Sequence, residues 1–356
     1  MRAAAPRIIL ALCGLVAALL AAEIGMRVLN ARADRALFDR AQLAAGRPLP
    51  KGPLGLGDLI RATELPDLVY ELRPSLERVD YVGAAVSTNS DGFRRTAPTA
   101  PATDRTYRIL GLGDSVMFGQ GVSDGREYLA RLEKSLSRDD PSREWQILNA
   151  AVPGYNTAQE LAFLRARGLA FKPDLVVIGF VSNDVNLPSF LNQARDPWSL
   201  RYSALAAWLR EERSERPGDV LAPAPTQATR VFRVEADPLK VDPRWRHLVG
   251  WSAVEAALDE LKSLSDEHGF RVLLFSHRES EHSEEALEAA RARGFATCNL
   301  APRLGNYMRE HGIKSYRGSE LTVSETDPHP SPTHHRIASD GLQRALERLG
   351  IAKAPE

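Results

Sequence analysis

Residues 107–115, YRILGLGDS, contain the pattern that decides the fold. A largely apolar run, YRILGL, is followed directly by Gly113-Asp114-Ser115. A short, continuous apolar run of this kind is typical of a strand that is covered on both faces, as in a parallel sheet. The polar residues after it then lie at the carboxyl end of the strand, where open α/β sheets bind their ligands.

The same pattern recurs along the chain and alternates with helical patterns. Further strands are predicted for WQILNA (145–150), DLVVIGF (174–180), RVLLFS (271–276) and ATCNL (296–300). Helices are predicted at 127–136, 158–168, 251–268, 281–293 and 332–349. Gly269 is a C-terminal stop signal, and Ser331-Pro332 is typical of an N-cap followed by the first helical residue. The succession predicts an α/β fold with a mainly parallel five-stranded sheet between layers of helices.

Bulk composition excludes several classes of function. Lys+Arg and Asp+Glu both total 46, so the formal net charge is zero and no overall field favours a nucleic-acid partner. The two cysteines, Cys13 and Cys298, lie far apart and do not suggest a disulfide framework. The histidines outside the motifs below show no ligand spacing, and we expect no metal or cofactor.

The N-terminus contains a long apolar stretch. Residues 8–26, IILALCGLVAALLAAEIGM, include one charge, Glu23. At a rise of about 1.5 Å per residue, such a helix roughly matches a hydrocarbon core of about 30 Å. We therefore expect residues 1–27 to be a single transmembrane anchor.

A cleaved signal peptide is the alternative interpretation of this segment. The nearest small-x-small site, Ala31-Arg32-Ala33, follows Arg27 and does not close the apolar run, which favours an uncleaved anchor. Arginines flank the run on both sides, so the positive-inside rule leaves its orientation open.

Three further segments surround or interrupt the alternating region. Residues 28–66 predict a juxtamembrane helix and a Gly/Pro-rich spacer, and we expect residues 1–60 to contribute nothing to the sheet. Residues 67–105 predict a β-rich extension with two or three short strands, ahead of a main domain at 106–350. An insertion at 187–250 contains Trp198, Tyr202, Trp208 and Trp245. It is a candidate lid or acceptor surface, although such aromatics are as often ordinary packing.

Polar residues follow the predicted strands at one edge of the sheet. Ser115 follows the first strand, Gly154 the second and Asn183 the third, while Asp327 and His329 stand near the C-terminus. Each of these motifs, taken alone, is also typical of a turn, a helix cap or a phosphate-binding loop. Together they supply what acyl transfer requires, namely a nucleophile, oxyanion donors, a base and an orienting acid.

Four stretches resemble, in order, the blocks of SGNH (GDSL-like) hydrolases across roughly residues 107–340. They are LGLGDSVMFGQGVSD, NAAVPGYNTAQELAFLRARG, KPDLVVIGFVSNDV and DPHPSPTHHRIA. The upstream STNSDGFR also resembles a segment of bacterial, membrane-anchored members. The resemblance implies a flavodoxin-like three-layer fold and a body outside the cytoplasm, in the periplasm or cell envelope. Met117 separates the chain from α/β-hydrolases, whose Gly-x-Ser-x-Gly motif needs a glycine there.

The resemblance also assigns roles to the motif residues. It implies Ser115 as nucleophile, Gly154 and Asn183 with the Ser115 N–H as oxyanion hole, and Asp327 with His329 as the rest of the triad. Family members often place two residues between Asp and His, which would put Thr326 in the acid position. Asp327 and His329 each precede a proline, however, which favours extended backbone and brings alternate side chains to the same side.

His334 departs from the family pattern, because it occupies what resembles a glycine position before His335. Both are interpreted as structural histidines in the first turn of a helix and are left out of the triad.

Three functions follow from the sequence. The first is an esterase acting on carbohydrate or lipid acyl esters, the second an O-acyltransferase for a cell-envelope glycan, and the third a non-catalytic binding domain on the same fold. The complete triad favours the first two.

Overall fold

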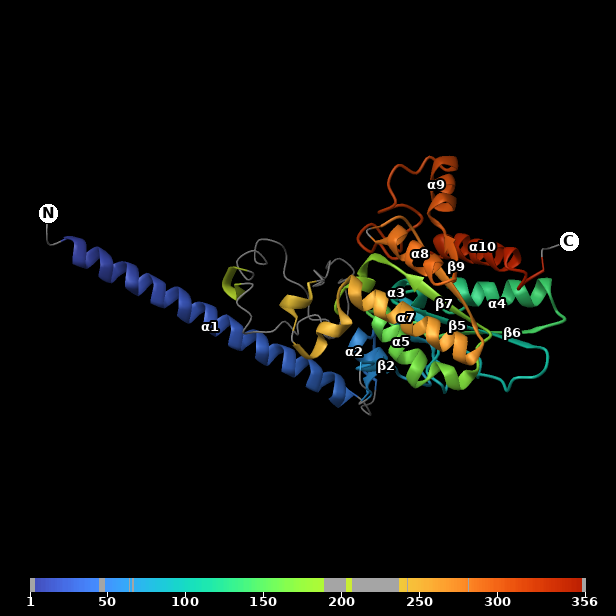
Figure 1. Cartoon of the computed structure of the whole chain (residues 1–356), viewed down its shortest axis with the longest axis horizontal. Helices are drawn as coiled ribbons and strands as arrows, with labels where there is room; N and C mark the ends of the chain where they lie inside the picture. The colour runs from blue at the N-terminus through green and yellow to red at the C-terminus, as the bar shows by residue number, and fades with distance from the viewer. Residues whose placement is uncertain are drawn as a thin grey trace.

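The structure, a computed structural model, describes residues 4–44, 49–63, 65, 67–188, 203–206, 237–241, 243–280 and 282–353. Its central feature is a five-stranded parallel sheet with the strand order β6-β5-β7-β8-β9 (Figure 1). The strands are β5 (Thr106–Gly113), β6 (Glu144–Asn149), β7 (Leu175–Phe180), β8 (Arg271–Ser276) and β9 (Ala296–Asn299). In chain order this is 2-1-3-4-5, the flavodoxin-like arrangement. The predicted fold is confirmed, and each strand lies on one of the apolar runs identified in the sequence.

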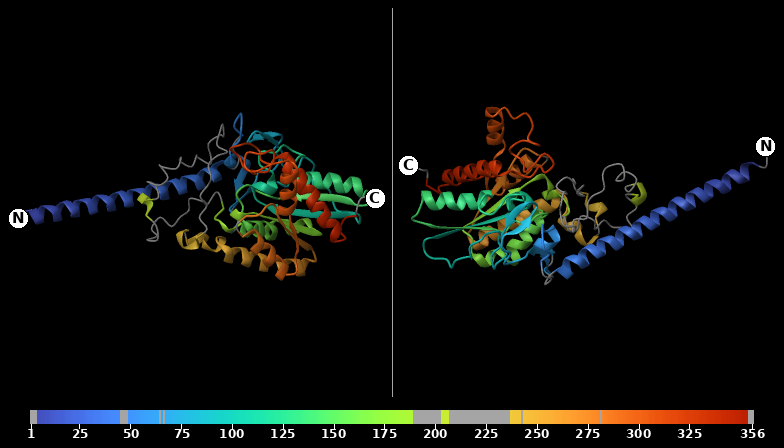
Figure 2. Two further views of the ribbon diagram at one scale, coloured as in Figure 1. Left: turned by 90° about the horizontal axis from the view of Figure 1, so that it is seen from above. Right: turned by 180° about the vertical axis from the view of Figure 1, so that it is seen from behind.

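Helices cover both faces of the sheet. On one face α5 (Thr157–Ala166) packs against α7 (Trp251–His268), and on the other α4 (Tyr128–Asp139) packs against α10 (Pro332–Arg348) (Figure 2). A further helix, α8 (Ser283–Ala292), packs on β8 and β9. β7 is buried along its whole length, as expected for a strand between two helical layers.

The predicted helix ends are present in the structure. Gly269 ends α7 in a left-handed conformation with φ +75°, and Ser331 caps α10 by accepting hydrogen bonds from the N–H groups of Thr333 and His334. The helix α9 (Ala301–Glu310) was not predicted, and Leu304 is its one fully buried residue, with Tyr307 and Met308 partly buried against the core. Short helices occupy the connections: α2 (Leu56–Leu59), α3 (Ser115–Phe118), and the 3₁₀ helices Gly168–Phe171, Ser182–Val185, Pro238–Lys240 and Pro243–Leu248.

The N-terminal helix α1 (Ala4–Ala44) extends away from the body in each view (Figures 1 and 2). Its segment Ile9–Leu29 is long and apolar enough to cross a membrane, and it is not buried against the rest of the molecule. A signal sequence would have the same properties. Glu23 pairs with Arg27 at 2.7 Å and accepts hydrogen bonds from the N–H groups of Ala204 and Leu205.

The segment between α1 and the sheet packs on the body. Leu54, Leu59 and Ile60 are buried in the hydrophobic core, although the sequence analysis assigned them to a spacer. β1 (Ile60–Ala62) pairs with β2 (Tyr70–Leu72), and β3 (Val79–Tyr81) pairs with β4 (Ala84–Val86), both antiparallel. The structured body therefore begins before residue 60, and its first residues contribute apolar contacts to the core.

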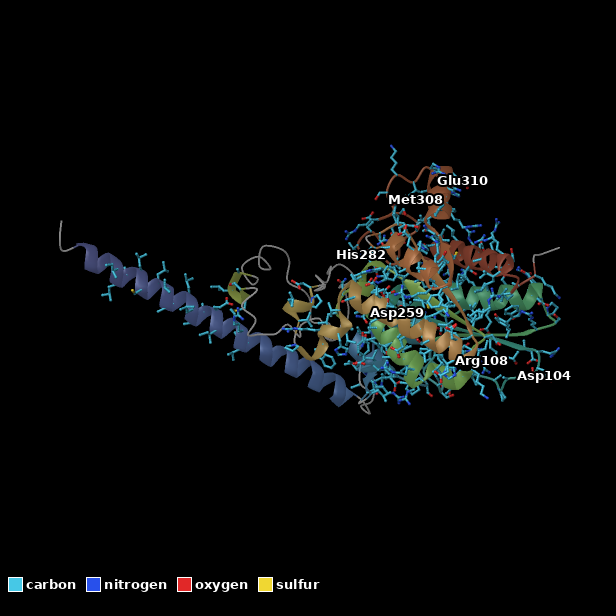
Figure 3. The ribbon with its side chains drawn as sticks, in the orientation of Figure 1. Asp104, Arg108, Asp259, His282, Met308 and Glu310 are labelled. Carbon is cyan, nitrogen blue, oxygen red and sulfur yellow. The ribbon has the colours of Figure 1, made fainter. Side chains whose placement is uncertain are left out.

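The predicted insertion at 187–250 lies largely outside the described residues. Of the four aromatic residues named above, Trp198, Tyr202 and Trp208 are outside them, and Trp245 packs partly buried against the core. Figure 3 places Asp104, just before β5, at the amino end of the sheet. His282, just before α8, lies toward the opposite end, where the strands finish and the candidate site is found.

Candidate active site

The turn from β5 into α3 presents Ser115. β5 ends at Gly113, Asp114 is the N-cap residue of α3, and Ser115 is the first residue of that helix. The Asp114 carboxylate accepts a hydrogen bond from Val116 N at 2.8 Å, and Gly119 ends the helix with φ +83°. Ser115 is partly exposed, while Asp114 beside it is buried. The turn thus places a hydroxyl at the rim of the sheet and its neighbouring carboxylate in the interior.

Close backbone approach allows the turn to pack on the sheet. A Cβ on Gly113 would lie 2.6 Å from Cβ of Met117, and a Cβ on Gly179 of β7 would lie 2.7 Å from its Cε. Met117 is fully buried in the space that these glycines leave. Met117, which stands where a Gly-x-Ser-x-Gly motif has its second glycine, therefore packs the helix that begins at Ser115 against β5 and β7.

Ser115, His329 and Asp327 are joined by hydrogen bonds. Ser115 Oγ lies 2.9 Å from His329 Nε2, and His329 Nδ1 lies 2.6 Å from Asp327 Oδ1. The same Asp327 oxygen accepts a hydrogen bond from the backbone N–H of His329 at 3.0 Å. The predicted contact between the two side chains across Pro328 is present, whereas Thr326 is exposed and bonds to Ser324.

The electrostatics of the triad favour an ionised Asp327. Burial raises the pKa of its carboxyl, but the hydrogen bonds and the charge of His329 outweigh that effect and bring the pKa below its usual 3.8. A carboxylate facing Nδ1 keeps the imidazole proton on that nitrogen, so the lone pair of Nε2 points toward Ser115. This arrangement can accept the proton of a serine hydroxyl.

Asn183 lies near Ser115, in the 3₁₀ helix that follows β7. Its Nδ2 donates a hydrogen bond to Asp114 Oδ2 at 2.9 Å, and the same oxygen is 3.4 Å from Ser115 Oγ. Burial raises the pKa of Asp114, and the hydrogen bonds from Asn183 and Val116 partly offset this. Sequence reasoning missed this bridging role, for which the Asp of the Gly-Asp-Ser motif was the available signal.

Two predicted site residues do not line the pocket formed by the described residues around Ser115: Asp327, which is buried and bonds to His329, and Gly154. Gly154 lies in the loop after β6. It has φ +83° in the turn Val152-Pro153-Gly154-Tyr155, which is closed by a hydrogen bond from Tyr155 N to Val152 O at 3.1 Å. Proline followed by a residue of positive φ is typical of a type II turn, so the structure gives Gly154 a conformational role. The turn is held against β5 by a hydrogen bond that Val152 N donates to Gly113 O.

The upstream segment STNSDGFR contacts the turn that carries Ser115. Its Arg94 is fully buried and donates hydrogen bonds to the carbonyl oxygens of Phe118 and Gly119 at the C-terminal end of α3, and to that of Val122 in the loop that follows. Cations stabilise helix C-termini, because the last carbonyl groups lack partners within the helix. Gln120, in the same loop, accepts a hydrogen bond from Tyr81 OH and approaches His329 Nδ1 at 3.4 Å.

These groups surround a pocket of about 130 Å³. Ser115, Asn183 and His329 line it, together with His277, Tyr316 and His334. The pocket combines a hydroxyl, an imidazole that can accept its proton and an amide donor. Such a set is suited to attack on an ester carbonyl and to binding the oxygen that becomes negatively charged.

The sequence model of the GDSL-like Lipase/Acylhydrolase family matches residues 112–337, which is more than half of the chain. The chain belongs to this family. The resemblance inferred from the four sequence blocks is confirmed, and membership of this acylhydrolase family supports hydrolysis of an ester as the general activity. No curated protein sequence is significantly similar to the chain.

Several solved hydrolase structures have a partial similarity to this GDSL-like family member. LAE5, an α/β hydrolase from the metagenome of Lake Arreo, is 16% identical over 70% of this chain and 97% of its own, with a TM-score of 0.42. A mutant of Axe2, an acetylxylan esterase from Geobacillus stearothermophilus, is 15% identical over 67% of this chain and 94% of its own, with a TM-score of 0.41. CEX, a two-domain esterase active on acetylated mannans, is 15% identical over 70% of this chain and 51% of its own, with a TM-score of 0.43.

Proposed function

We propose that this chain is a serine esterase that hydrolyses carbohydrate or lipid acyl esters through an acyl-enzyme on Ser115. The observation that carries the proposal is the pair of contacts made by His329, 2.9 Å to Ser115 Oγ through Nε2 and 2.6 Å to Asp327 Oδ1 through Nδ1. Membership of the acylhydrolase family supports the same reaction class.

In the proposed first half-reaction, Nε2 of His329 takes the hydroxyl proton of Ser115 as Oγ attacks the ester carbonyl carbon. Asp327 holds the tautomer and stabilises the imidazolium that forms. The imidazolium then gives its proton to the alcohol oxygen, the bond from that oxygen to the carbonyl carbon breaks, and the acyl group stays on Ser115. In the second half-reaction, His329 takes a proton from a water molecule that attacks the carbonyl carbon of the acyl-enzyme. The imidazolium then gives this proton to Ser115 Oγ as the bond from Oγ to the carbonyl carbon breaks, which releases the acid and restores the serine.

We propose that the oxyanion is bound by Asn183 and by the backbone N–H groups of Ser115 and Gly154. One N–H of the Asn183 amide donates to Asp114, which orients the amide so that its second N–H can face the carbonyl oxygen. A single donor of this kind is worth about 3 kcal/mol in the transition state. The assignment of Gly154 rests on the family resemblance and on its position after β6.

A panel of acyl esters and acylated sugars tests the proposal. The full chain in detergent should hydrolyse at least one class, and Ser115→Ala and His329→Ala should each lose nearly all kcat while keeping the wild-type melting temperature. The double variant should lose little more than either single variant, because triad members act as a unit. Substantial turnover by Ser115→Ala would contradict the proposal.

The O-acyltransferase alternative uses the same residues and differs in the acceptor. A bound sugar hydroxyl can outcompete water when it is held in near-attack geometry. An activated acetyl ester supplied with glycan oligomers separates the two functions, because a hydrolase releases acetate and a transferase acetylates the glycan. We expect acetate release. Glycan acylation that disappears in Ser115→Ala would favour the transferase.

We also propose that α1 anchors the chain in a membrane and that the body lies outside the cytoplasm. The exposed apolar segment Ile9–Leu29 supports the anchor. In intact cells, added protease should cleave the body only after the barriers outside the cytoplasmic membrane have been opened. A body protected by the cytoplasmic membrane would contradict this orientation.

A further inference from the structure

The pocket around Ser115 contains polar residues that the proposed mechanism does not use. They are His277, which follows β8, Tyr316, which lies between α9 and α10, and His334, in the first turn of α10. The guanidinium carbon of Arg278 lies 4.9 Å from the centre of the Tyr316 ring, within cation–π distance. Three segments far apart in the sequence thus bring one polar wall to the nucleophile.

This wall is built as a hydrogen-bonded chain. Tyr316 OH lies 2.9 Å from His334 Nδ1, and His334 Nε2 lies 3.5 Å from His277 Nδ1. The far nitrogen, His277 Nε2, is buried and has no hydrogen-bond partner among the described residues. His334 is itself fully buried, so its imidazole is fixed and holds the Tyr316 hydroxyl from inside the protein.

Both imidazoles are neutral. Burial lowers the pKa of His334 to about 3 and lowers that of His277 well below its usual 6.5, with the neighbouring His334 as a second cause. Burial also raises the pKa of Tyr316 to about 12, so the phenol keeps its proton. Beside the Arg278 guanidinium, these three side chains therefore present neutral groups that can exchange the roles of donor and acceptor.

Two proton arrangements satisfy the chain, because a neutral imidazole has one donor nitrogen and one acceptor nitrogen. In the first, Tyr316 donates to His334, which donates to His277, and the phenol oxygen can accept a hydrogen bond from a ligand. In the second, His277 donates to His334, which donates to the phenol oxygen, and the Tyr316 O–H is directed to a ligand. His277 Nε2 lacks a described partner in both arrangements, so the ligand selects between them.

A group that matches such a wall is an alcohol hydroxyl, which also both donates and accepts. The wall lines the same pocket as Ser115 and His329, so it can contact atoms close to the ester bond. An unsubstituted acyl group offers no hydroxyl, which leaves the alcohol portion of the ester as the ligand.

We propose that Tyr316 binds a hydroxyl group near the ester oxygen of a polyhydroxylated alcohol, and that His334 and His277 position the Tyr316 hydroxyl for this contact. The proposal rests on the proposed esterase function and adds the substrate class, an ester of a polyol or sugar whose neighbouring hydroxyl is free. It also gives His334, which departs from the family pattern, a role in substrate selection.

The test compares two esters of one size, glycerol monoacetate and n-propyl acetate, which differ in the hydroxyl groups of the alcohol. Wild-type protein should have the higher kcat/KM for glycerol monoacetate. Tyr316→Phe should reduce that value about tenfold, as expected for one lost hydrogen bond, and should leave kcat/KM for n-propyl acetate within about twofold. A ratio of the two kcat/KM values that is unchanged in Tyr316→Phe would overturn the proposal.

Two further variants separate binding from structure. Tyr307→Phe removes a hydroxyl that bonds to exposed Glu320 outside the pocket, and it should change neither ester. His334→Phe fills the same space without nitrogens and should lower the ratio as Tyr316→Phe does; a folded His334→Phe protein with a wild-type ratio would contradict the positioning role. If His334→Phe does not fold, Tyr316→Phe still decides the proposal. Absence of turnover with both esters and the wider ester panel would instead contradict the esterase function itself.

Discussion

The replacement Asp327→Asn tests how the carboxylate supports His329. Asp327 Oδ1 accepts two hydrogen bonds, from Nδ1 of His329 at 2.6 Å and from its backbone N–H at 3.0 Å. An asparagine would face these donors with its oxygen, because an NH₂ group there would oppose the backbone N–H. The imidazole should therefore keep its proton on Nδ1 and its lone pair toward Ser115.

The expected loss is then that of the negative charge alone. A hydrogen bond to a charged group contributes about 1.5 to 3 kcal/mol and a neutral one about 0.5 to 1.5 kcal/mol, a difference of about 1 to 2 kcal/mol. At about 1.36 kcal/mol per tenfold change, kcat should fall about 5- to 30-fold. This is far less than the loss of about 10⁴-fold that the corresponding replacement causes in chymotrypsin-type proteases, where the wrong tautomer forms.

Initial rates of ester hydrolysis at saturating substrate measure this effect. Glu325→Gln is the matched control, since Glu325 is exposed, lies two residues from Asp327 and should leave kcat unchanged. A kcat for Asp327→Asn within twofold of wild type would refute a role for the charge. A loss of about 10⁴-fold would refute the argument that the backbone N–H of His329 fixes the tautomer.

Three further predictions concern the rim, the core and the N-terminal segment. Asn183→Ala should lower kcat about a hundredfold with a smaller effect on KM, as expected for a transition-state donor, and an unchanged kcat would leave Asn183 a structural residue only. Burial raises the pKa of Glu160 well above 4.5, and both of its carboxylate oxygens lack described partners. Its contribution to stability is therefore lost as pH rises through the raised pKa. From about pH 5 upward, the free energy of unfolding of Glu160→Gln should increase relative to that of wild type. A difference between the two proteins that does not change with pH would contradict this. Removal of residues 1–48 should give a soluble, active protein, whereas removal of 1–60 deletes buried core residues and should lower the melting temperature; equal melting temperatures would contradict the packing seen here.

The sheet and its rim could be predicted because they depend on local patterns. Each apolar run that became a strand is short and continuous, and Ser115 and Asn183 lie within three residues of the ends of β5 and β7. The contact of Asp327 with His329 followed from Pro328 and Pro330, because each proline favours an extended conformation of the residue before it. In these cases the information lies within a few residues of the sequence.

The parts that could not be predicted depend on contacts between distant segments. The bond from Asn183 to Asp114, the support of α3 by Arg94 and the chain from Tyr316 to His277 each join residues from different elements. α9 also escaped prediction, and Leu304 is its one fully buried residue. The core residues before β1 were hidden in a stretch rich in glycine and proline, whose composition resembles a linker.

The central claim is that His329 activates Ser115 for covalent catalysis. A fluorophosphonate ester, which reacts with activated serines, followed by intact-mass and peptide mass spectrometry of the full chain, tests this directly. The account predicts a single adduct on the peptide containing Ser115, formed together with the loss of esterase activity, and strongly slowed labelling in His329→Ala. Labelling of a different residue, or labelling of Ser115 at the wild-type rate in His329→Ala, would contradict the account.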